Sequence, residues 1–168
     1  RNRASAALNS IVAARPDFAG LHMDCVHLMG VLNVTPDSFT DGGVNLSPAK
    51  AIKTGKAMWA DGASIIDVGG ESTRPGAESV SAEEEIARVQ PVIEALVKDG
   101  IKVSVDTSKP EVMEAAVAAG ACMINDIYAL RRPGALATVA RLDVPVCLMH
   151  MQGTPATMQN APRYENIG

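Results

Sequence analysis

Short apolar runs alternate with amphipathic stretches along most of this chain, and clusters of glycine, proline, aspartate or asparagine separate them. Runs of this length favour buried strands, and apolar residues spaced by three and four favour helices. The pattern predicts strands over residues 27–34, 63–68, 101–105, 121–125 and 144–149, and helices over residues 47–61, 81–98, 109–119 and 133–142. Because single helices connect successive strands, the strands should run parallel with right-handed crossovers.

The ends of the predicted helices carry signals of their own. Ser47 precedes Pro48, which is an N-cap followed by proline at the first helical position, and Ser81 with Glu84 forms a capping-box pattern. Residues 4–14 predict one more short helix ahead of the first strand. Glycine follows three of the helices just before a strand, where a left-handed residue ends a helix: Gly62, Gly100 and Gly120.

Two α/β architectures fit this alternation, the doubly wound open sheet and the (β/α)8 barrel. An open sheet concentrates its site at one switch point, whereas a barrel places functional groups at the carboxyl ends of many strands. The ends of all five predicted strands carry side chains capable of chemistry or ligand contact: Asn33, Asp67, Asp106, Asn125 with Asp126, and Met149 with His150. The pattern therefore favours the barrel.

The length of the chain sets how much of a barrel is present. A complete barrel needs about 250 residues, whereas four βα units and a fifth strand can be counted here. The predicted fold class is α/β, a partial (β/α)8 TIM barrel with roughly the first four to five βα units. The expected division is an N-terminal leader over residues 1–26 and the barrel part over residues 27–168.

Composition narrows the function classes. The chain has 168 residues, 47% hydrophobic but only 3% aromatic, so one domain with an aliphatic core is expected. The net charge is −4 and the basic residues are scattered, which argues against nucleic acid or an anionic membrane as a partner. No apolar run approaches the roughly 18 residues of a membrane span, and a cytoplasmic location is expected. The cysteines Cys25, Cys122 and Cys147 lie far apart in apolar runs and are expected to be reduced core thiols.

Two of the connections after strands are rich in groups that bind anions or hard cations. Residues 33–43 carry hydroxyls and oxygen ligands closed by glycines, which suits a phosphate or a cation. Residues 69–76 combine glycine amides with the Thr73 hydroxyl and the Arg74 guanidinium, which suits an anion clamp. An ordinary loop with Asx turns is the alternative for the first segment, and a solvated turn for the second.

Three later strand ends carry residues suited to a heterocyclic ligand. Asp106 suits an amidine-like edge or a developing cation, although Asp106 or Ser108 would also serve as the cap of the next helix. Asn125 offers a donor and an acceptor to a heterocycle edge, with an Asx turn as the alternative. Met149 suits packing on a planar ring, although a methionine at a strand end is more often an ordinary core residue. His150 has no visible partner and is given no role in proton transfer.

Five motifs, in order along the chain, carry a family resemblance. They are residues 29–39 (MGVLNVTPDSF), 62–76 (GASIIDVGGESTRPG), 103–110 (VSVDTSKP), 124–127 (INDI) and 147–153 (CLMHMQG). Over about residues 27–160 the chain resembles the dihydropteroate synthases. The resemblance implies a (β/α)8 barrel that uses Mg2+ and takes part in folate synthesis. Its reaction displaces diphosphate from 6-hydroxymethyl-7,8-dihydropterin diphosphate with the amine of p-aminobenzoate.

The resemblance also implies roles for residues near the diphosphate. Asn33 would lie close to Mg2+ and the diphosphate, with Asp41 as a weaker candidate for the metal. Thr73 and Arg74 would lie on a mobile loop, where Arg74 neutralises the departing diphosphate. Asp106 would stabilise positive charge on the pterin, so Asp106 and Arg74 are the implied catalytic residues.

The implied substrate pockets use further residues. Asp106 and Asn125 would bind the pterin by hydrogen bonds, and Met149 by packing on its ring. Phe39 and Pro75 would help to shape the p-aminobenzoate site, which sulfonamides also occupy.

The same resemblance implies that this chain is the N-terminal portion of a longer protein. Members of the family carry further pterin-binding and basic residues on later strands, so we expect the 168-residue chain alone to be inactive and the full-length protein to be a homodimer. Two other functions stay open. One is the methyltetrahydrofolate-handling domain of corrinoid methyltransferases, and the other is a pterin-binding module without catalysis.

Overall fold

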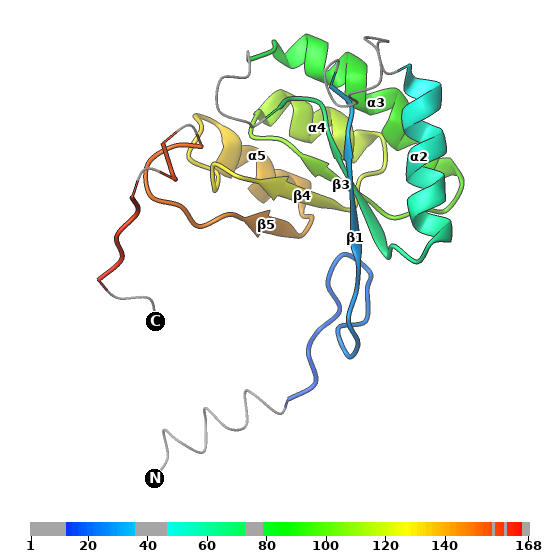
Figure 1. Ribbon diagram of the computed structural model, residues 1–168, viewed down its shortest axis with the longest axis horizontal. Coiled ribbons are helices and arrows are strands. Elements are labelled where there is room, and N and C mark those ends of the chain that lie inside the picture. Colours follow the sequence, from blue (N-terminus) through cyan, green and yellow to red (C-terminus); the bar gives the residue numbers. More distant parts are fainter. Residues whose placement is uncertain (1–12, 36–46, 73–78, 156, 160, 166–168) are drawn as a thin grey trace.

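Five strands form one parallel sheet, in which each strand pairs with the next strand along the chain (Figure 1). The computed structural model describes residues 13–35, 47–72, 79–155, 157–159 and 161–165. The strands are β1 (Met29–Asn33), β2 (Ile65–Gly69), β3 (Val103–Asp106), β4 (Met123–Asp126) and β5 (Val146–Leu148). A doubly wound sheet reverses its strand order at a switch point, whereas this order never reverses. The predicted partial (β/α)8 barrel is confirmed.

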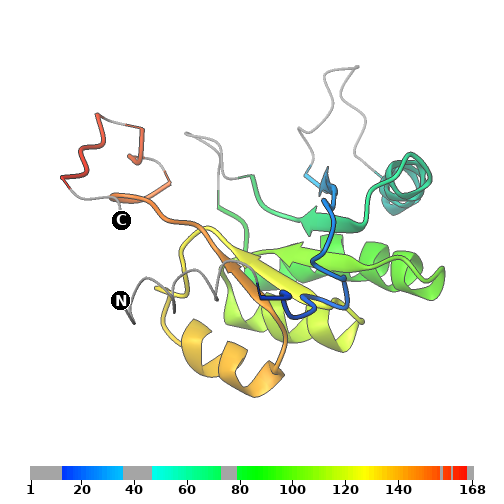
Figure 2. The ribbon, with the colours of Figure 1, turned by 90° about the horizontal axis from the view of Figure 1, so that it is seen from below.

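Four helices cover one face of this sheet, as Figures 1 and 2 show. They are α2 (Pro48–Ala60), α3 (Ala82–Lys98), α4 (Pro110–Ala118) and α5 (Ala135–Leu142). Each boundary of these helices and strands lies within two residues of its predicted position. None of the described helices is long and apolar enough to cross a membrane. The helix predicted over residues 4–14 falls almost entirely outside the described residues, and the division after residue 26 stays a prediction.

The predicted helix ends are present, with one difference. Oγ of Ser81 accepts the N–H of Glu84 at 3.1 Å, but the carboxylate of Glu84 accepts from Arg88 at 2.5 Å. The described contacts thus show the Ser81 half of the capping box, while the Glu84 carboxylate forms an i,i+4 ion pair with Arg88. The three predicted C-terminal glycines all have left-handed backbone: Gly62 (φ 107°), Gly100 (φ 77°) and Gly120 (φ 104°).

The core lies between the sheet and the helices and is aliphatic, as predicted. Its largest fully buried apolar side chains are Leu32, Ile66, Val68, Val89, Val92, Ile93, Leu96, Val103, Val105, Met113 and Ile124. Alternate residues of each strand face this core, since side chains of a strand point to opposite faces in turn. The residues between them share the other face of the sheet, and these include Asn33, Asp67, Asp106 and Asn125.

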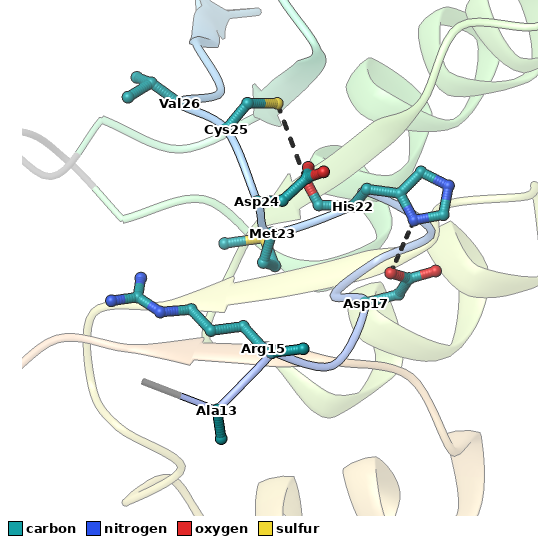
Figure 3. Close-up of a pocket in the computed structure, with 9 residues that line it drawn as sticks. Ala13, Arg15, Asp17, His22, Met23, Asp24, Cys25 and Val26 are labelled. Atoms are coloured by element: carbon teal, nitrogen blue, oxygen red, sulfur yellow. Dashed lines mark hydrogen bonds and ion pairs between the residues drawn. The ribbon is translucent and has the colours of Figure 1, made fainter. Parts of the chain in front are cut away.

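The segment before β1 packs across the amino ends of the strands. Ala19 joins a small buried cluster with Ile65 and Met123, which begin β2 and β4. A pocket in this segment, drawn in Figure 3, is formed by Ala13, Ala14, Arg15, Asp17, His22, Met23, Asp24, Cys25 and Val26. The pocket belongs to the amino-terminal end of the sheet, opposite to the polar strand ends. Catalytic sites of barrels lie at the other end.

The expectation of core thiols is wrong for two of the three cysteines. All three are free, but Cys25 and Cys147 are exposed and Cys122 is half-buried. Cys25 lies in the segment that precedes β1, and Cys147 lies on β5, which has only β4 as a neighbour among the described residues. An apolar run therefore did not guarantee burial, because burial depends on what covers the strand.

Candidate functional site

The register of the sheet places the predicted site residues in one row. Asn33 pairs with Gly69, Gly69 with Asp106, and Asp106 with Asn125. Residues in one row of a sheet share a face, and neighbouring strands lie about 4.8 Å apart. The predicted metal ligand and the two predicted pterin ligands thus occupy the same face at the carboxyl ends of β1, β3 and β4.

Gly69 leaves space in the middle of this row. A side-chain Cβ at this position would lie 3.5 Å from Oδ2 of Asp106 and 3.6 Å from Oδ1 of Asn33. Both oxygens therefore border the same small volume above the glycine. Such a volume suits a ligand that approaches the backbone closely, which is a usual reason for glycine at a strand end.

Asp67 lies one step below the row on the same face, because it precedes Gly69 by two residues. The residue is buried, with 3% of its surface exposed. Its Oδ2 accepts a hydrogen bond from Nδ2 of Asn125 at 2.9 Å, whereas its Oδ1 has no partner among the described residues. Burial raises the pKa of Asp67, and the neighbouring polar side chains of Ser104 and Asn125 oppose that rise.

Asp106 is the most perturbed carboxyl group of the site. Burial, followed by the charges of Asp67, Glu85, Asp126 and Glu71, raises its pKa from 3.8 to about 7. A carboxyl group in such surroundings gains from a positively charged ligand, because the ligand offsets the repulsion. Perturbed groups of this kind are typical of functional sites.

The alternative role of Asp106 as a helix cap is not realised. The cap position of α4 is Lys109, which makes no side-chain cap hydrogen bond. The hydroxyl of Thr107 instead accepts the N–H of Lys109 at 3.3 Å. Pro110 stands at the first helical position, where a missing N–H leaves no donor unsatisfied, and α4 begins without a side-chain cap from Lys109.

The Asx turn predicted as an alternative at the end of β4 involves Asp126 and not Asn125. The Asp126 carboxylate accepts the N–H groups of Tyr128 and Leu130, each at 2.8 Å. Asn125 points to the other face and contacts Asp67. Asp126 therefore shapes the turn after β4, whereas Asn125 lies on the face of the candidate site.

Met149 and His150 follow the end of β5. β5 ends one residue before Met149, whose N–H donates to the carbonyl of Asp126 at 3.3 Å. The His150 ring lies 5.2 Å from the ring of Tyr164, so it has an aromatic neighbour that the sequence did not predict. Packing of Met149 on a ligand ring stays a prediction.

Five candidate residues lie outside the described residues: Phe39, Asp41, Thr73, Arg74 and Pro75. Their segments leave the carboxyl ends of β1 and β2, since Asn33 and Gly69 are the last residues of those strands. Their roles stay predictions.

Two features of the site were missed by sequence reasoning. Asp67 was noted as a polar strand end but was not assigned a role, although its two-residue spacing from Gly69 predicts the same face. A buried ion cluster of Lys109, Glu71 and Glu85 was not foreseen. Glu85 stands four residues before the buried Val89, and this helical spacing predicts that it faces the core.

The described residues offer few metal ligands. No group of three His, Cys, Asp or Glu side chains among them is placed to hold a metal ion. Mg2+ is commonly held by one or two protein oxygens together with water and substrate phosphates, so it does not need such a group. The amide oxygen of Asn33, which borders the volume above Gly69, fits that kind of site.

Comparison with known proteins gives a consistent result. The sequence model of a family described as pterin binding enzyme matches residues 29–168. Dihydropteroate synthase of Escherichia coli (strain K12) is 57% identical over 142 residues, which are 84% of this chain and 50% of that protein. The chain spans about half the length of the curated relatives it matches.

Solved structures show the same fold. Yersinia pestis dihydropteroate synthase in a sulfonamide drug complex has a TM-score of 0.80 at 49% identity, over 90% of this chain and 56% of that one. Dihydropteroate synthase of Xanthomonas albilineans with 4-aminobenzoic acid has a TM-score of 0.78 at 53% identity, over 91% of this chain and 55% of that one.

Proposed function

This chain belongs to the family of pterin-binding enzymes, and on that premise we propose that the protein containing it is a dihydropteroate synthase. The reaction is the condensation of 6-hydroxymethyl-7,8-dihydropterin diphosphate with p-aminobenzoate to 7,8-dihydropteroate and diphosphate. The observation that carries the proposal is the row of Asn33, Asp106 and Asn125 at the carboxyl ends of β1, β3 and β4. The 57% identity to a synthase of that name over this region supports it.

Asp106 is proposed to stabilise the reacting pterin. As the bond between the pterin methylene carbon and the diphosphate oxygen breaks, positive charge develops on the pterin. A carboxylate that is destabilised by its own neighbours interacts favourably with such a charge in a water-poor site. The amine of p-aminobenzoate then forms the new bond to carbon and loses a proton, so no activated serine, cysteine or histidine is required.

Asn125 and Met149 are proposed to hold the pterin. The hydrogen bond to Asp67 orients the Asn125 amide on the site face, which suits recognition of a heterocycle edge. Met149 would pack on the ring, as a polarisable side chain does.

The diphosphate and the metal are assigned to the loops after β1 and β2. Thr73 and Arg74 would bind the departing diphosphate, and Asn33 would hold Mg2+ with Asp41 as a weaker candidate. When bound, Mg2+ would neutralise the negative charge of the leaving group. Phe39 and Pro75 would shape the p-aminobenzoate site, where sulfonamides would compete.

Pyrophosphate release tests the proposal. The complete reading frame that contains this chain is expressed and supplied with the pterin diphosphate, p-aminobenzoate and Mg2+. We expect release that requires all three. Binding of the pterin diphosphate without release would indicate a non-catalytic module, and methyl transfer from methyltetrahydrofolate would indicate the other pterin-binding barrel.

A second test addresses the metal. Asn33→Ala should raise the Mg2+ concentration needed for half-maximal release by at least about tenfold, because loss of even an outer-shell partner of a metal ligand costs that much. Asn125→Ala is the matched control, because it changes a residue of the same row and should leave the Mg2+ requirement unaltered. Equal Mg2+ requirements in the Asn33→Ala variant and the unaltered protein would contradict the assignment. The homodimer and the cytoplasmic location are likewise proposals, and sedimentation and cell fractionation test them.

A further inference from the structure

Lys109 lies between two carboxylates that come from the preceding βα unit. Its Nζ donates to Oε2 of Glu71 at 2.8 Å and to Oε2 of Glu85. Glu71 follows β2, Glu85 lies in the first turn of α3, and Lys109 caps α4. Only 11% of the Lys109 side chain, 18% of Glu71 and 1% of Glu85 is exposed. We call these three residues the Lys109 cluster.

Stability alone does not explain the Lys109 cluster. A buried ion pair gains little over well-packed apolar side chains, because desolvation offsets the attraction. Here one ammonium faces two carboxylates, and Oε1 of Glu85 is buried without a partner among the described residues. Burial would lower the pKa of Lys109, but the hydrogen bonds to Glu71 and Glu85 together with the charges of these two residues outweigh burial and raise it. The ammonium therefore stays charged and faces two carboxyl groups, so the formal charge of the cluster is −1.

Glu71 also joins the two ends of the connection between β2 and α3. Its Oε1 accepts the N–H of Val80 at 3.3 Å, while its Oε2 accepts from Lys109. The carbonyl of the preceding residue, Gly70, accepts from Nη1 of Arg88 at 2.8 Å. The beginning of the connection is thus bound both to its end and to α3.

Lys109 links this connection to the strand end that carries Asp106. It stands three residues after Asp106, and residues 107–109 are all buried. We propose that Lys109 is a positioning residue, which with Glu71 and Glu85 fixes the segment leaving β2 against the end of β3. Its kinetic consequence rests on the proposed function, because only that function gives Asp106 a role in a reaction.

Lys109 also affects the electrostatic surroundings of Asp106. Glu85 and Glu71 both contribute to the raised pKa of Asp106. The Lys109 ammonium lies between them and offsets their charge. Its loss would leave the carboxylates of Glu71 and Glu85 without a cation, and a second substitution that neutralises one of them restores the original net charge of the cluster.

Substitutions within the Lys109 cluster separate the effect of its charge from the effect of its contacts. Lys109→Met in the full-length protein removes the ammonium and leaves Glu85 buried and unpaired, so it should destabilise the fold. The double variant Lys109→Met with Glu85→Gln removes that charge, keeps the net charge of the cluster, and should recover most of the stability. Lys56→Met is the matched control, because Lys56 pairs with Asp99 at 2.5 Å in a half-exposed ion pair at the opposite end of the sheet.

Two measurements, amide hydrogen exchange and steady-state kinetics, report how these variants change the site. Hydrogen exchange of the Val80 amide should become at least about tenfold faster in the double variant, while the amides of β3 keep their protection. The kcat of pyrophosphate release should fall by about 10- to 100-fold, because a small displacement of reacting groups is costly. Lys56→Met should change neither quantity.

The outcomes separate positioning from a purely structural role. A double variant that recovers its urea midpoint but not its kcat, with fast exchange at Val80, supports the proposal. Unchanged exchange at Val80, or a kcat that recovers together with stability, overturns it. If the unaltered protein releases no pyrophosphate, the proposed function fails, and the exchange of Val80 still decides the role of Lys109.

Discussion

Asn125 and Asp67 are joined by a hydrogen bond that crosses β3. Nδ2 of Asn125 on β4 donates to Oδ2 of Asp67 on β2 at 2.9 Å, although β2 and β4 are not neighbours in the sheet. The bond uses one amide hydrogen of Asn125 and fixes the orientation of the amide. The buried carboxylate of Asp67 therefore determines how the Asn125 amide is presented to a ligand.

The first prediction concerns this bond. Asp67→Ala in the full-length protein should weaken binding of the pterin diphosphate by about tenfold, because the Asn125 amide loses the partner that orients it. Titration calorimetry measures the change. Asp67→Asn is the control, since its amide oxygen still accepts the hydrogen bond, and its affinity should stay within about threefold of the unaltered protein. Undiminished affinity of Asp67→Ala would show that the bond does not orient Asn125.

The second prediction concerns the pH dependence of activity. Asp106 must be ionised to stabilise a cation, and its pKa is raised to about 7. The kcat/KM of pyrophosphate release should therefore fall as the pH decreases through about 7. Among the neighbouring charges, that of Asp67 raises the pKa of Asp106 most. Asp67→Asn removes this charge, so it should move the acid limb of the pH–rate profile to lower pH. A limb that stays in place, or moves to higher pH, would contradict the coupling of the two carboxyl groups.

The third prediction concerns stability against pH. The pKa of Asp106 is raised in the folded protein relative to its ordinary value of 3.8. Between these two values the unfolded chain releases the proton first, so the free energy of unfolding decreases as the pH rises from about 4 to about 7. Asp106→Asn lacks this penalty and should be more stable than the unaltered protein at pH 8, by about 1–3 kcal/mol.

Urea unfolding of both proteins at several pH values measures this difference, which should vanish near pH 4. The same Asp106→Asn variant should release pyrophosphate at least about 100-fold more slowly at pH 8, because it cannot carry negative charge. A gain of stability with a loss of activity is expected, because the Asp106 charge is repelled by its acidic neighbours but is needed for the reaction. A variant that loses both would indicate that Asp106 supports the fold.

The fourth prediction concerns two glycines at helix ends. Gly100 and Gly120 both have left-handed backbone, but a Cβ at Gly100 meets nothing within 4 Å, whereas a Cβ at Gly120 would lie 2.7 Å from Cγ1 of Val97. Gly100→Ala should cost about 1 kcal/mol of unfolding free energy, and Gly120→Ala about 1–3 kcal/mol more. Adding Val97→Ala to Gly120→Ala should show favourable coupling, because it removes the clash. Equal costs for the two glycine substitutions would contradict the packing at Gly120.

The sequence by itself determined the secondary structure, the parallel direction of the strands and the presence of polar groups at the strand ends. These properties depend on neighbours a few residues apart, such as the apolar spacing of α3 and the cap that Ser81 gives to it. The same local patterns placed Asn33, Asp106 and Asn125 at ends of strands. The family motifs added roles for them that local physics does not supply.

Only the tertiary structure decided which of these groups meet. The bond from Asn125 to Asp67 joins residues 58 positions apart, and the bond from Lys109 to Glu71 joins residues 38 positions apart. Such contacts depend on strand register and on how each helix crosses the sheet, and a shift of one residue would turn every side chain of a strand to the other face. The same reason explains why Cys147 is exposed in an apolar run, since burial is a property of the covering elements and not of the strand.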